Sequence, residues 1–357
     1  MLIGQVVDAL ATPFVGYHSD HTDNYLSAKY GKRKLWHLFG TVCVLLSFPF
    51  IFMDCIGCSM AHKWAQMYYF ASFILIFQIG WAAVQISHLS LIPELAEDPH
   101  VRTHLTAIRF GFTVFSNLFV YIITWIVLHM TGECDKEQVG PRDAWKFRHI
   151  VYIVLGVGTV ASVLFHIFVS EGRGLRQQQP LIDYNDNNRV HFSIFRKGIL
   201  YQVASIYMST RLVVNISQVF IRGRSRGTLN RSELKLADYC THIVLGFGGS
   251  QMLVTSLSLT ADLVGDRTEA SAFVYGLMSF TDKLSCGAVI AIIQLYADGA
   301  SSDYYRSVLS WVCGGATVLG LICTLTTPKL TPDPQVTDDN NPSINTIEET
   351  GPPTDLL

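Results

Sequence analysis

Residues 87–98 read Ser-His-Leu-Ser-Leu-Ile-Pro-Glu-Leu-Ala-Glu-Asp, and a similar stretch, Thr-Ser-Leu-Ser-Leu-Thr-Ala-Asp-Leu-Val-Gly-Asp, occupies residues 255–266. In each copy an apolar segment ends in an acidic turn, and a second apolar segment follows. Glu94 of the first copy falls on Asp262 of the second. A pattern that recurs in two distant places indicates a duplicated architecture with one copy in each half of the chain. Chance similarity between Leu- and Ser-rich membrane helices is the alternative, because the two turns differ in length.

The composition of the chain is that of a membrane protein. Of its 357 residues, 50% are apolar and 15% are charged, and the mean hydropathy is +0.31. Soluble domains have about 25% charged residues, so the chain is drawn from another class. The formal net charge of -2 gives no support for nucleic-acid binding. Cys55 and Cys58 have no second pair at zinc spacing, so we expect no metal site. Since the chain also has no nucleophile elbow or phosphate-binding loop, we expect neither an enzyme nor a cofactor.

Apolar segments recur along the whole chain. The first, residues 1–17, lacks the basic start and the cleavage site of a signal peptide, so we interpret it as the last part of a membrane helix. The others lie near residues 35–53, 67–92, 104–130, 147–169, 198–221, 241–263, 270–296 and 304–327. Each is close to the roughly 20 residues that a bilayer requires. The sequence therefore predicts an all-α membrane protein with nine helices.

Polar stretches divide these segments into two bundles. Residues 171–197 form a long hydrophilic interruption, and we predict a cytosolic linker there between an N-terminal bundle, 1–170, and a C-terminal bundle, 198–327. Residues 328–357 are rich in Pro, Asp, Asn and Thr, which is typical of a disordered tail.

Positive charge predicts the orientation of the chain. The loops at 18–34 and 171–197 carry four and five Lys and Arg residues, so both should face the cytosol. Alternation then places the turns at 93–103 and 264–269 on the same side. Both copies of the repeat should therefore end at the cytosolic face.

Residues 221–240 break this pattern. Alternation makes them non-cytosolic, yet they carry five Lys and Arg residues. The first repeat copy also has two helices before it in its half, whereas the second has one. The simplest account is that about two helices are missing near 221–245 and that the first helix is missing or truncated. About 9 of the 12 helices of two six-helix halves would then be present.

The loop after the first apolar segment resembles the signature of the major facilitator superfamily. That signature has a Gly, an Asp, and then a Gly followed by basic residues. Gly16 and Asp20 carry its first part and Gly-Lys-Arg-Lys at residues 31–34 carries the second, with residues 21–30 inserted between them. Residues 7–16, Val-Asp-Ala-Leu-Ala-Thr-Pro-Phe-Val-Gly, resemble the glycoside-pentoside-hexuronide cation symporter branch of that superfamily. The resemblance implies a two-bundle transporter in the lipid membrane that moves a small solute by alternating access, together with a coupled proton or cation.

Further strings resemble one particular member of this superfamily more closely. They are residues 36–38, 40–52, 85–95, 210–218, 253–257 and 272–276. This resemblance covers roughly residues 1–220 and 246–327, and it implies import of cysteine into lysosomes and melanosomes with an effect on pigmentation. Two alternatives stay open. One is a cation-coupled sugar symporter, and the other is a shortened, transport-inactive chain that acts only as a membrane interaction partner.

Charged residues inside apolar segments are the candidates for the transport site, because burying a charge in a bilayer is costly. Asp8 lies about 12 Å inside Gly16 at about 1.5 Å per residue, and Thr12 follows it by one helical turn. In the symporter branch the position of Asp8 belongs to the cation site, and the position of Thr12 is normally a second aspartate. The loss of that carboxylate argues against a sodium site, whereas Asp8 alone is able to bind a proton. A structural Asp8 paired with a neighbour is the alternative.

Other embedded polar residues complete the predicted substrate- and ion-binding set. Arg109 and Arg211 could each hold a solute carboxylate, or each could form an internal salt bridge. Asp282 and Lys283 are adjacent, so they are either mutually satisfied or split between two partners. The full set is Asp8, Thr12, Arg109, Arg211, Asn215, Tyr275, Asp282 and Lys283.

A second group of residues is predicted to form a gate at the cytosolic end. Asp20 should meet the positive N-terminus of the helix that begins near Thr268, and the resemblance associates this contact with one access state. Glu94 and Asp262 should pair with Arg102, Arg267 or the basic loop. The predicted gating set is Asp20, Lys32, Arg33, Glu94 and Asp262. Solvated positions near helix ends, and not a proton relay, are expected for His37, His88, His129 and His166.

Overall fold

Helices make up all the regular structure in the described part of the chain. The computed structural model describes residues 2–22, 29–53, 55–57, 62–96, 98–129, 144–171, 198–225, 232–264, 270–296 and 302–327. The helices are α1 (Leu2–Asp20), α3 (Lys32–Phe52), α4 (Lys63–Leu95), α5 (Pro99–His129), α6 (Ala144–Phe168), α8 (Gly198–Ser225), α9 (Ser232–Val264), α10 (Ser271–Leu295) and α11 (Ser302–Thr326). The all-α class is therefore confirmed. The predicted tail, most of the linker and Arg267 lie outside the described residues.

Within the described residues, five helices are long and apolar enough to cross a membrane by themselves, namely α3, α4, α5, α6 and α10. The other predicted spans, α1, α8, α9 and α11, are also helical, and α11 contains a shorter apolar stretch, Ser310–Thr326.

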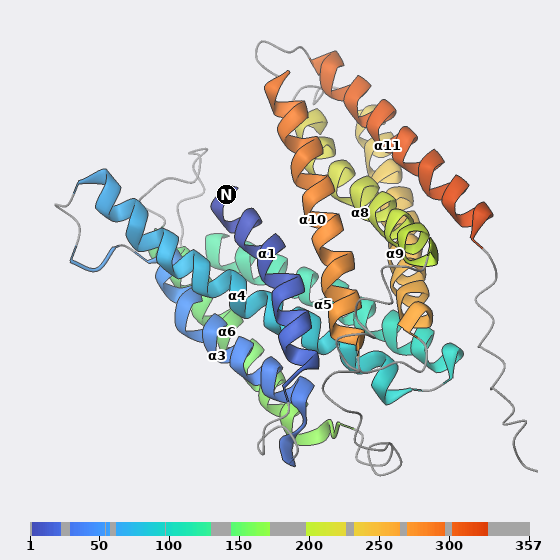
Figure 1. Ribbon diagram of the computed structural model, residues 1–357. Coiled ribbons are helices and arrows are strands. Elements are labelled where there is room, and N and C mark those ends of the chain that lie inside the picture. The colour runs from blue at the N-terminus through green and yellow to red at the C-terminus, as the bar shows by residue number, and fades with distance from the viewer. Residues whose placement is uncertain are drawn as a thin grey trace, which may run out of the picture.

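The helices form two groups. Figure 1 shows α1, α3, α4 and α6 on one side and α8, α9, α10 and α11 on the other, with α5 reaching from the first group to the second. Within the first group α3 packs along α4, and α1 also packs on α4. Within the second, α8 packs on α9, α10 and α11. These groups correspond to the N- and C-terminal halves of the sequence.

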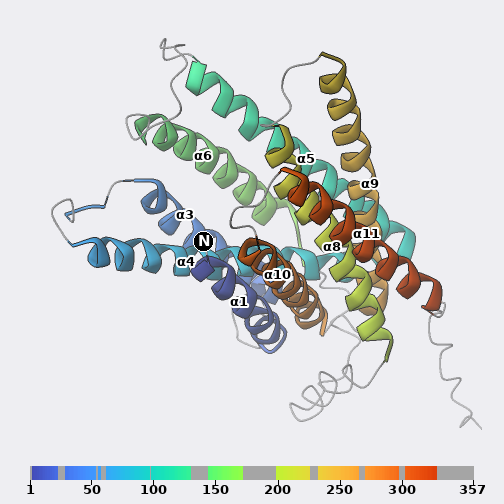
Figure 2. The same cartoon turned by 90° about the horizontal axis from the view of Figure 1, so that it is seen from above.

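The two groups are joined mainly where α1 lies along α10 (Figures 1 and 2). Two glycines permit this close approach. A Cβ atom on Gly16 would stand 2.5 Å from the Ala272 carbonyl oxygen, and one on Gly276 would stand 2.6 Å from the Thr12 carbonyl oxygen. Each helix thus presents a glycine to the backbone of the other, which allows the two backbones to touch.

Two further contacts between the groups have the arrangement expected from the duplication that the sequence predicts. The repeat equates α4 with α9 and α5 with α10. The structure packs α4 against α10, and it packs α9 against α5. The first helix of each copy therefore packs against the second helix of the other copy, as expected for two halves related by pseudo-two-fold symmetry.

A shared core lies between the groups. Val15, Ile86, Val203, Ala272 and Met278, from four different helices, are each completely buried. The outward faces are apolar and exposed, as on α5, where Phe112, Phe115, Leu118, Tyr121 and Trp125 all lie on the surface. Polar groups inside and apolar groups outside are the arrangement that a lipid environment favours.

Candidate functional site

Two clusters of charged residues are buried where the two groups of helices meet. The end cluster comprises Asp20, Arg33, Glu94, Glu171 and Ser271, and the central cluster comprises Asp8, Arg211, Asn215, Asp282 and Lys283. Asp8 and Asp20 both lie on α1, twelve residues apart. At about 1.5 Å per residue the clusters are separated by about 18 Å, so the central cluster lies near the middle of a bilayer about 30 Å thick.

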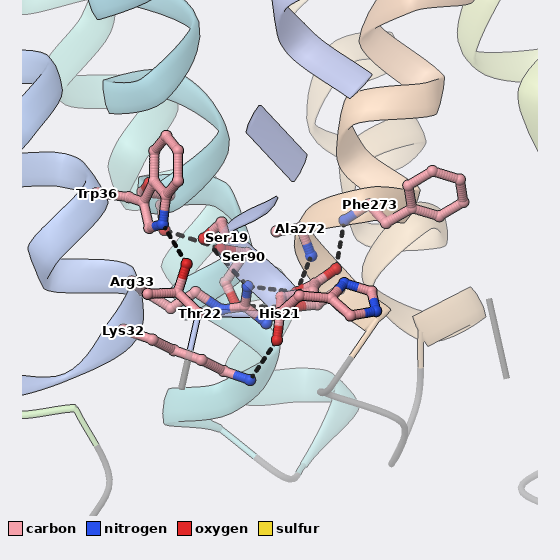
Figure 3. Close-up of polar contacts among 12 residues, drawn as sticks. Ser19, His21, Thr22, Lys32, Arg33, Trp36, Ser90, Ala272 and Phe273 are labelled. Carbon is pink, nitrogen blue, oxygen red and sulfur yellow. Dashed lines mark hydrogen bonds and ion pairs between the residues drawn. The ribbon is translucent and has the colours of Figure 1, made fainter. Parts of the chain in front are cut away.

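Arg33 is the centre of the end cluster, and its side chain is completely buried. Its guanidinium group forms an ion pair with Asp20 and lies 3.7 Å from the Glu94 carboxylate. It also donates to the Ser19 hydroxyl at 3.4 Å and to the Ser271 hydroxyl at 3.1 Å (Figure 3). A guanidinium group has five N–H donors and no acceptor, so this one group holds α1, α4 and α10 together at the N-terminus of α3.

Asp20 joins the two halves directly. Its carboxylate accepts hydrogen bonds from the backbone N–H groups of Ala272 at 3.4 Å and Phe273 at 2.8 Å, in the first turn of α10 (Figure 3). The first N–H groups of a helix have no partner within the helix and carry partial positive charge, so a carboxylate is well suited to that position. The contact that the sequence predicted between Asp20 and the following helix is therefore present.

Glu171 closes the end cluster from the side of α6. Its carboxylate accepts from the backbone N–H of Arg33 at 3.0 and 3.2 Å and from that of Lys34 at 3.2 Å. Gly31 makes room for it, with φ of +103° and no side chain, because a Cβ atom there would overlap the carboxylate. Sequence reasoning missed Glu171. The signal was an acid directly after an apolar segment, in a chain whose basic motif 31–34 needed a counter-charge.

The other predicted gating residues lie at the same end. Lys32 donates from Nζ to the Asp20 carbonyl oxygen at 3.2 Å, and Glu94 faces Arg33. Asp262 is in electrostatic contact with Arg102, whose Nε donates to the Ala96 carbonyl oxygen at 2.7 Å. The C-terminal ends of α1, α4 and α9, Glu171 after α6 and the first turn of α10 thus lie at one end of the molecule.

Asp8 and Lys283 form the ion pair of the central cluster that links the two halves. The Lys283 Nζ lies 2.6 Å from Asp8 Oδ1 and 3.4 Å from the Asp8 carbonyl oxygen, and the two side chains are 12% and 11% exposed. Breaking a pair that is shielded in this way leaves an uncompensated charge, which typically costs about 3–5 kcal/mol. The pair therefore favours contact between α1 and α10 at the depth of the bilayer centre.

Asp282 turns toward the C-terminal half instead. It lies 3.0 Å from Arg211 Nε and 3.5 Å from Asn215 Nδ2, and it accepts from the Cys286 thiol at 3.3 Å. Asp282 and Lys283 are thus split between partners, which is one of the two arrangements expected from their adjacency. Arg211 is 26% exposed on its side chain whereas Asp282 is 6% exposed, so the arginine presents the accessible side of this pair.

Thr12, Tyr275 and Arg109 lie around these pairs. Thr12 is completely buried and donates to the Ala9 carbonyl oxygen at 3.1 Å, within its own helix. Tyr275 is also buried, and it is in electrostatic contact with Arg109. The Arg109 Nε donates to His88 Nδ1 at 3.3 Å. The predicted binding residues are therefore neighbours in space, contributed by α1, α5, α8 and α10.

The histidines of the first half differ from the sequence-based expectation. His37 is 6% exposed and not solvated, and its Nδ1 lies 3.1 Å from His166 Nε2. The His37 and His88 rings are neighbours, with centroids 6.2 Å apart. The expected solvation is wrong for His37, because α3, α4 and α6 bring its ring together with those of His88 and His166. His129 is exposed, and its Nδ1 lies 2.8 Å from the Trp125 carbonyl oxygen within α5, as expected of an interfacial residue.

Comparisons with known proteins agree with this architecture. A family model described as MFS/sugar transport protein matches residues 1–179. Major facilitator superfamily domain-containing protein 12 of Mus musculus is 37% identical over 394 residues, covering 89% of this chain and 82% of the relative. The Homo sapiens protein of the same name is 37% identical over 400 residues, covering 90% and 83%. Among solved structures, the E. coli fucose:proton symporter FucP superimposes with a TM-score of 0.58 at 9% identity, over 90% of each chain.

Proposed function

This chain belongs to the major facilitator superfamily, and we propose that it carries a small solute across a membrane by alternating access around the central cluster. The observation that carries this proposal is the Asp8–Lys283 ion pair, buried near the middle of the bilayer where α1 and α10 meet. A charge pair at that depth is costly, and in transporters such residues mark the path of the solute and the coupled ion.

The end cluster supports a gate. Asp20 holds the first turn of α10, and Arg33 holds Asp20, Glu94 and Ser271. Rocking the two groups of helices apart at this end would break the Asp20 bonds to α10 and the Arg33 bond to Ser271 together. The cluster would then stabilise the state that is closed toward the cytosol and open on the other side.

A proton is the coupling ion that the central cluster fits best. Asp8 has Thr12 one turn away instead of a second carboxylate, and Lys283 already neutralises it. Asp282, the other carboxylate of the cluster, is engaged by Arg211 and Asn215, so the cluster offers few free oxygen ligands to sodium. Asp8 can exchange its partner Lys283 for a proton, which links the ion pair between the halves to protonation.

The solute that we propose is cysteine, imported into lysosomes or melanosomes. The sequence resemblance to one member of the superfamily carries this choice, and the central cluster is compatible with it. Arg211 is the exposed partner of its ion pair and Arg109 lies nearby, so a solute carboxylate would find a guanidinium group that is able to bind it with two parallel hydrogen bonds.

Two alternative functions remain. A cation-coupled sugar symporter is favoured by the description of the matching family model. A transport-inactive interaction partner is favoured by the aligned length. The alignments with the mouse and human proteins extend over 394 and 400 residues, more than the 357 of this chain. Those relatives therefore carry residues within the aligned span that have no counterpart here. The loss of about two helices near 221–245 is our proposal for where they lie.

Uptake measurements test the proposal. The full chain is expressed in cells whose own lysosomal cysteine uptake has been removed, and isolated lysosomes are incubated with radiolabelled cysteine, cystine or melibiose. We expect cysteine uptake that increases when the pH gradient is dissipated, because a proton that enters together with the solute moves into an acidic lumen. Uptake of melibiose alone would establish the sugar symporter, and uptake of none of the three from correctly inserted protein would establish the transport-inactive chain.

A double-mutant cycle tests the ion pair itself. We expect Asp8→Asn and Lys283→Gln each to reduce uptake about tenfold or more and to lower the temperature of thermal unfolding, because each leaves its partner as an unpaired buried charge. The double variant should regain part of the lost thermal stability but not the uptake. Additive losses of stability in the double variant would contradict a direct interaction between the two side chains.

A further inference from the structure

A run of ring and hydroxyl groups crosses the N-terminal half between the end cluster and the central cluster. Tyr30 Oη lies 2.9 Å from His166 Nδ1, and His166 Nε2 lies 3.1 Å from His37 Nδ1. The His37 and His88 ring centroids are 6.2 Å apart, and His88 Nδ1 accepts from Arg109 Nε at 3.3 Å. Helices α3, α4, α5 and α6 contribute one residue each, and Tyr30 lies just before α3.

The run becomes steadily deeper in the membrane. His166 lies two residues from the end of α6 and His37 five residues into α3, which places them about 3 and about 8 Å from the end that carries Arg33. His88 lies seven residues before the end of α4 and Arg109 ten residues into α5, at about 10 and about 15 Å. Arg109 is also in electrostatic contact with Arg211 and Tyr275, at the central cluster.

We propose that Tyr30, His166, His37 and His88 form a proton relay from the cytosolic end to the centre of the membrane, and that Arg109 controls its inner end. This inference rests on the proposed transport function and identifies a route for the coupled proton. Burial raises the pKa of Tyr30, so its hydroxyl keeps a proton to donate.

The first part of the relay has two equivalent hydrogen-bond settings. In one, Tyr30 donates to His166 and His166 donates to His37. In the other, every donor and acceptor in the run is reversed. A proton taken from water at Tyr30 and a proton released from the far nitrogen of His37 convert one setting into the other, and no group needs to keep a net charge. The gap between His37 and His88 is one that a ring rotation or a bridging water molecule spans.

Arg109 fixes the tautomer of His88. A guanidinium group can only donate, so the His88 Nδ1 that it contacts must be an unprotonated acceptor. His88 therefore cannot become an imidazolium cation until Arg109 leaves it. A solute carboxylate that draws Arg109 away exposes Nδ1, and a proton arriving from His37 can then bind. Solute carboxylate and proton are thereby taken up together, which is the requirement of a symporter.

The charges that face the rings favour this order of events. Arg109 faces His88, and Lys34 faces His166 and lies 4.7 Å from the centre of the Tyr30 ring. The aromatic ring of Phe165 packs on both His37 and His88. Cations at both ends of the run oppose a resting positive charge on the histidines. A proton is therefore held on His88 only while Arg109 is engaged elsewhere.

Proton movement and solute exchange separate the relay from transport in general. The full chain is reconstituted in liposomes that contain a pH-sensitive dye, with radiolabelled cysteine as the probe. We expect His37→Gln and His166→Gln to reduce cysteine-driven proton movement about tenfold, while cysteine counterflow at equal pH stays within about twofold of the unmodified protein. His129→Gln is the matched control and should change neither. Normal proton movement in His37→Gln would overturn the relay and leave the transport function intact.

A measurement without solute tests whether Arg109 determines the protonation of His88. With 15N-labelled histidine, His88 should keep an unprotonated Nδ1 from about pH 8 to about pH 5 and should become protonated in this range in Arg109→Gln. This result would support the relay even if cysteine were not transported, in which case only the proposed function would fail. Protonation of His88 at the same pH in both proteins would overturn the inference.

Discussion

Gly31 is the residue that allows Glu171 to reach the N-terminus of α3 in the end cluster. Its φ of +103° lies in a region that L-residues with a side chain rarely adopt, and a Cβ atom would overlap the Glu171 carboxylate. Glu171 occupies that space to accept hydrogen bonds from Arg33 and Lys34. A side chain at this position would therefore strain the backbone and expel the carboxylate that caps α3.

A glycine pair separates these two effects. Gly57 also has a positive φ, +75°, but a Cβ atom there would meet nothing within 4 Å. We expect Gly57→Ala to cost about 1 kcal/mol through the backbone alone, and Gly31→Ala to lower the temperature of thermal unfolding much further. Scanning fluorimetry of the purified variants measures the difference. Equal shifts would show that contact with Glu171 adds nothing.

For single residues, the sequence predicted which charged side chains are buried better than it predicted their ion-pair partners. Asp8, Asp20 and Asp282 are conspicuous because acids are rare inside apolar segments. The sequence did not determine which residue each acid pairs with, because adjacent residues on a helix point about 100° apart and reach different neighbours. This is why Lys283 pairs with Asp8 rather than with Asp282 beside it. Such a choice depends on which helices pack together, and one helix does not contain that information.

Among the helices, the crossing of α1 and α10 has the largest effect on how the two groups pack together. The two backbones approach so closely that Gly276 has the Thr12 carbonyl oxygen where its Cβ atom would lie, at 2.6 Å. We expect Gly276→Val to push the helices apart and to weaken the bonds from Asp20 to α10. Cysteines introduced at Tyr17 and Phe273, whose rings are 6.4 Å apart, should then cross-link several-fold less efficiently.

Gly287 provides the control for this experiment. It lies on the same helix, and a Cβ atom there would meet nothing within 4 Å. Gly287→Val should leave cross-linking unchanged in the same background, from which the native cysteines have been removed. If both valine variants cross-link equally well, the spacing of α1 and α10 does not depend on the glycine.

Helix boundaries differ from the apolar segments in a systematic way. The apolar run near 241–263 predicted a helix of that length, but α9 begins at Ser232. Likewise the run at 67–92 lies inside α4, Lys63–Leu95. Hydropathy reports the part of a helix that suits lipid, whereas Glu, Lys and Leu at its ends continue the helix because their helix propensity is high. The sequence therefore predicts which helices exist more reliably than where they end.

On the scale of the molecule, the crossed packing of α4 on α10 and α9 on α5 is the arrangement expected from the duplication that two short stretches predicted. The repeat could not reveal which helices would touch, because equivalence between halves does not specify contact. Contact also depends on the close approach of α1 and α10, which glycines permit. The two halves therefore meet through the repeat helices and through one helix outside the repeat.

The path of the chain through the membrane can be tested with epitope tags. α10 starts at Ser271 in the end cluster, and Leu200, near the start of α8, packs in one core cluster with Val264 and Ala270 beside it. A tag inserted after residue 185 should therefore face the cytosol, and one after residue 228 should face the opposite side. A C-terminal tag is the control and should behave like the first. Antibody binding before and after selective permeabilisation measures this, and a cytosolic tag at 228 would contradict the path.

The attachment of Glu171 has a mechanical consequence. The covalent connection between the halves leaves the first bundle at this residue, which is fastened to the backbone of Arg33. The side chain of Arg33 forms an ion pair with Asp20, and Asp20 accepts a hydrogen bond from the first turn of α10. A force on the chain that leads to α8 and a force across the α1–α10 contact therefore both act on Arg33. A displacement of the connecting chain would thus alter the contact between Asp20 and α10 without deforming either bundle.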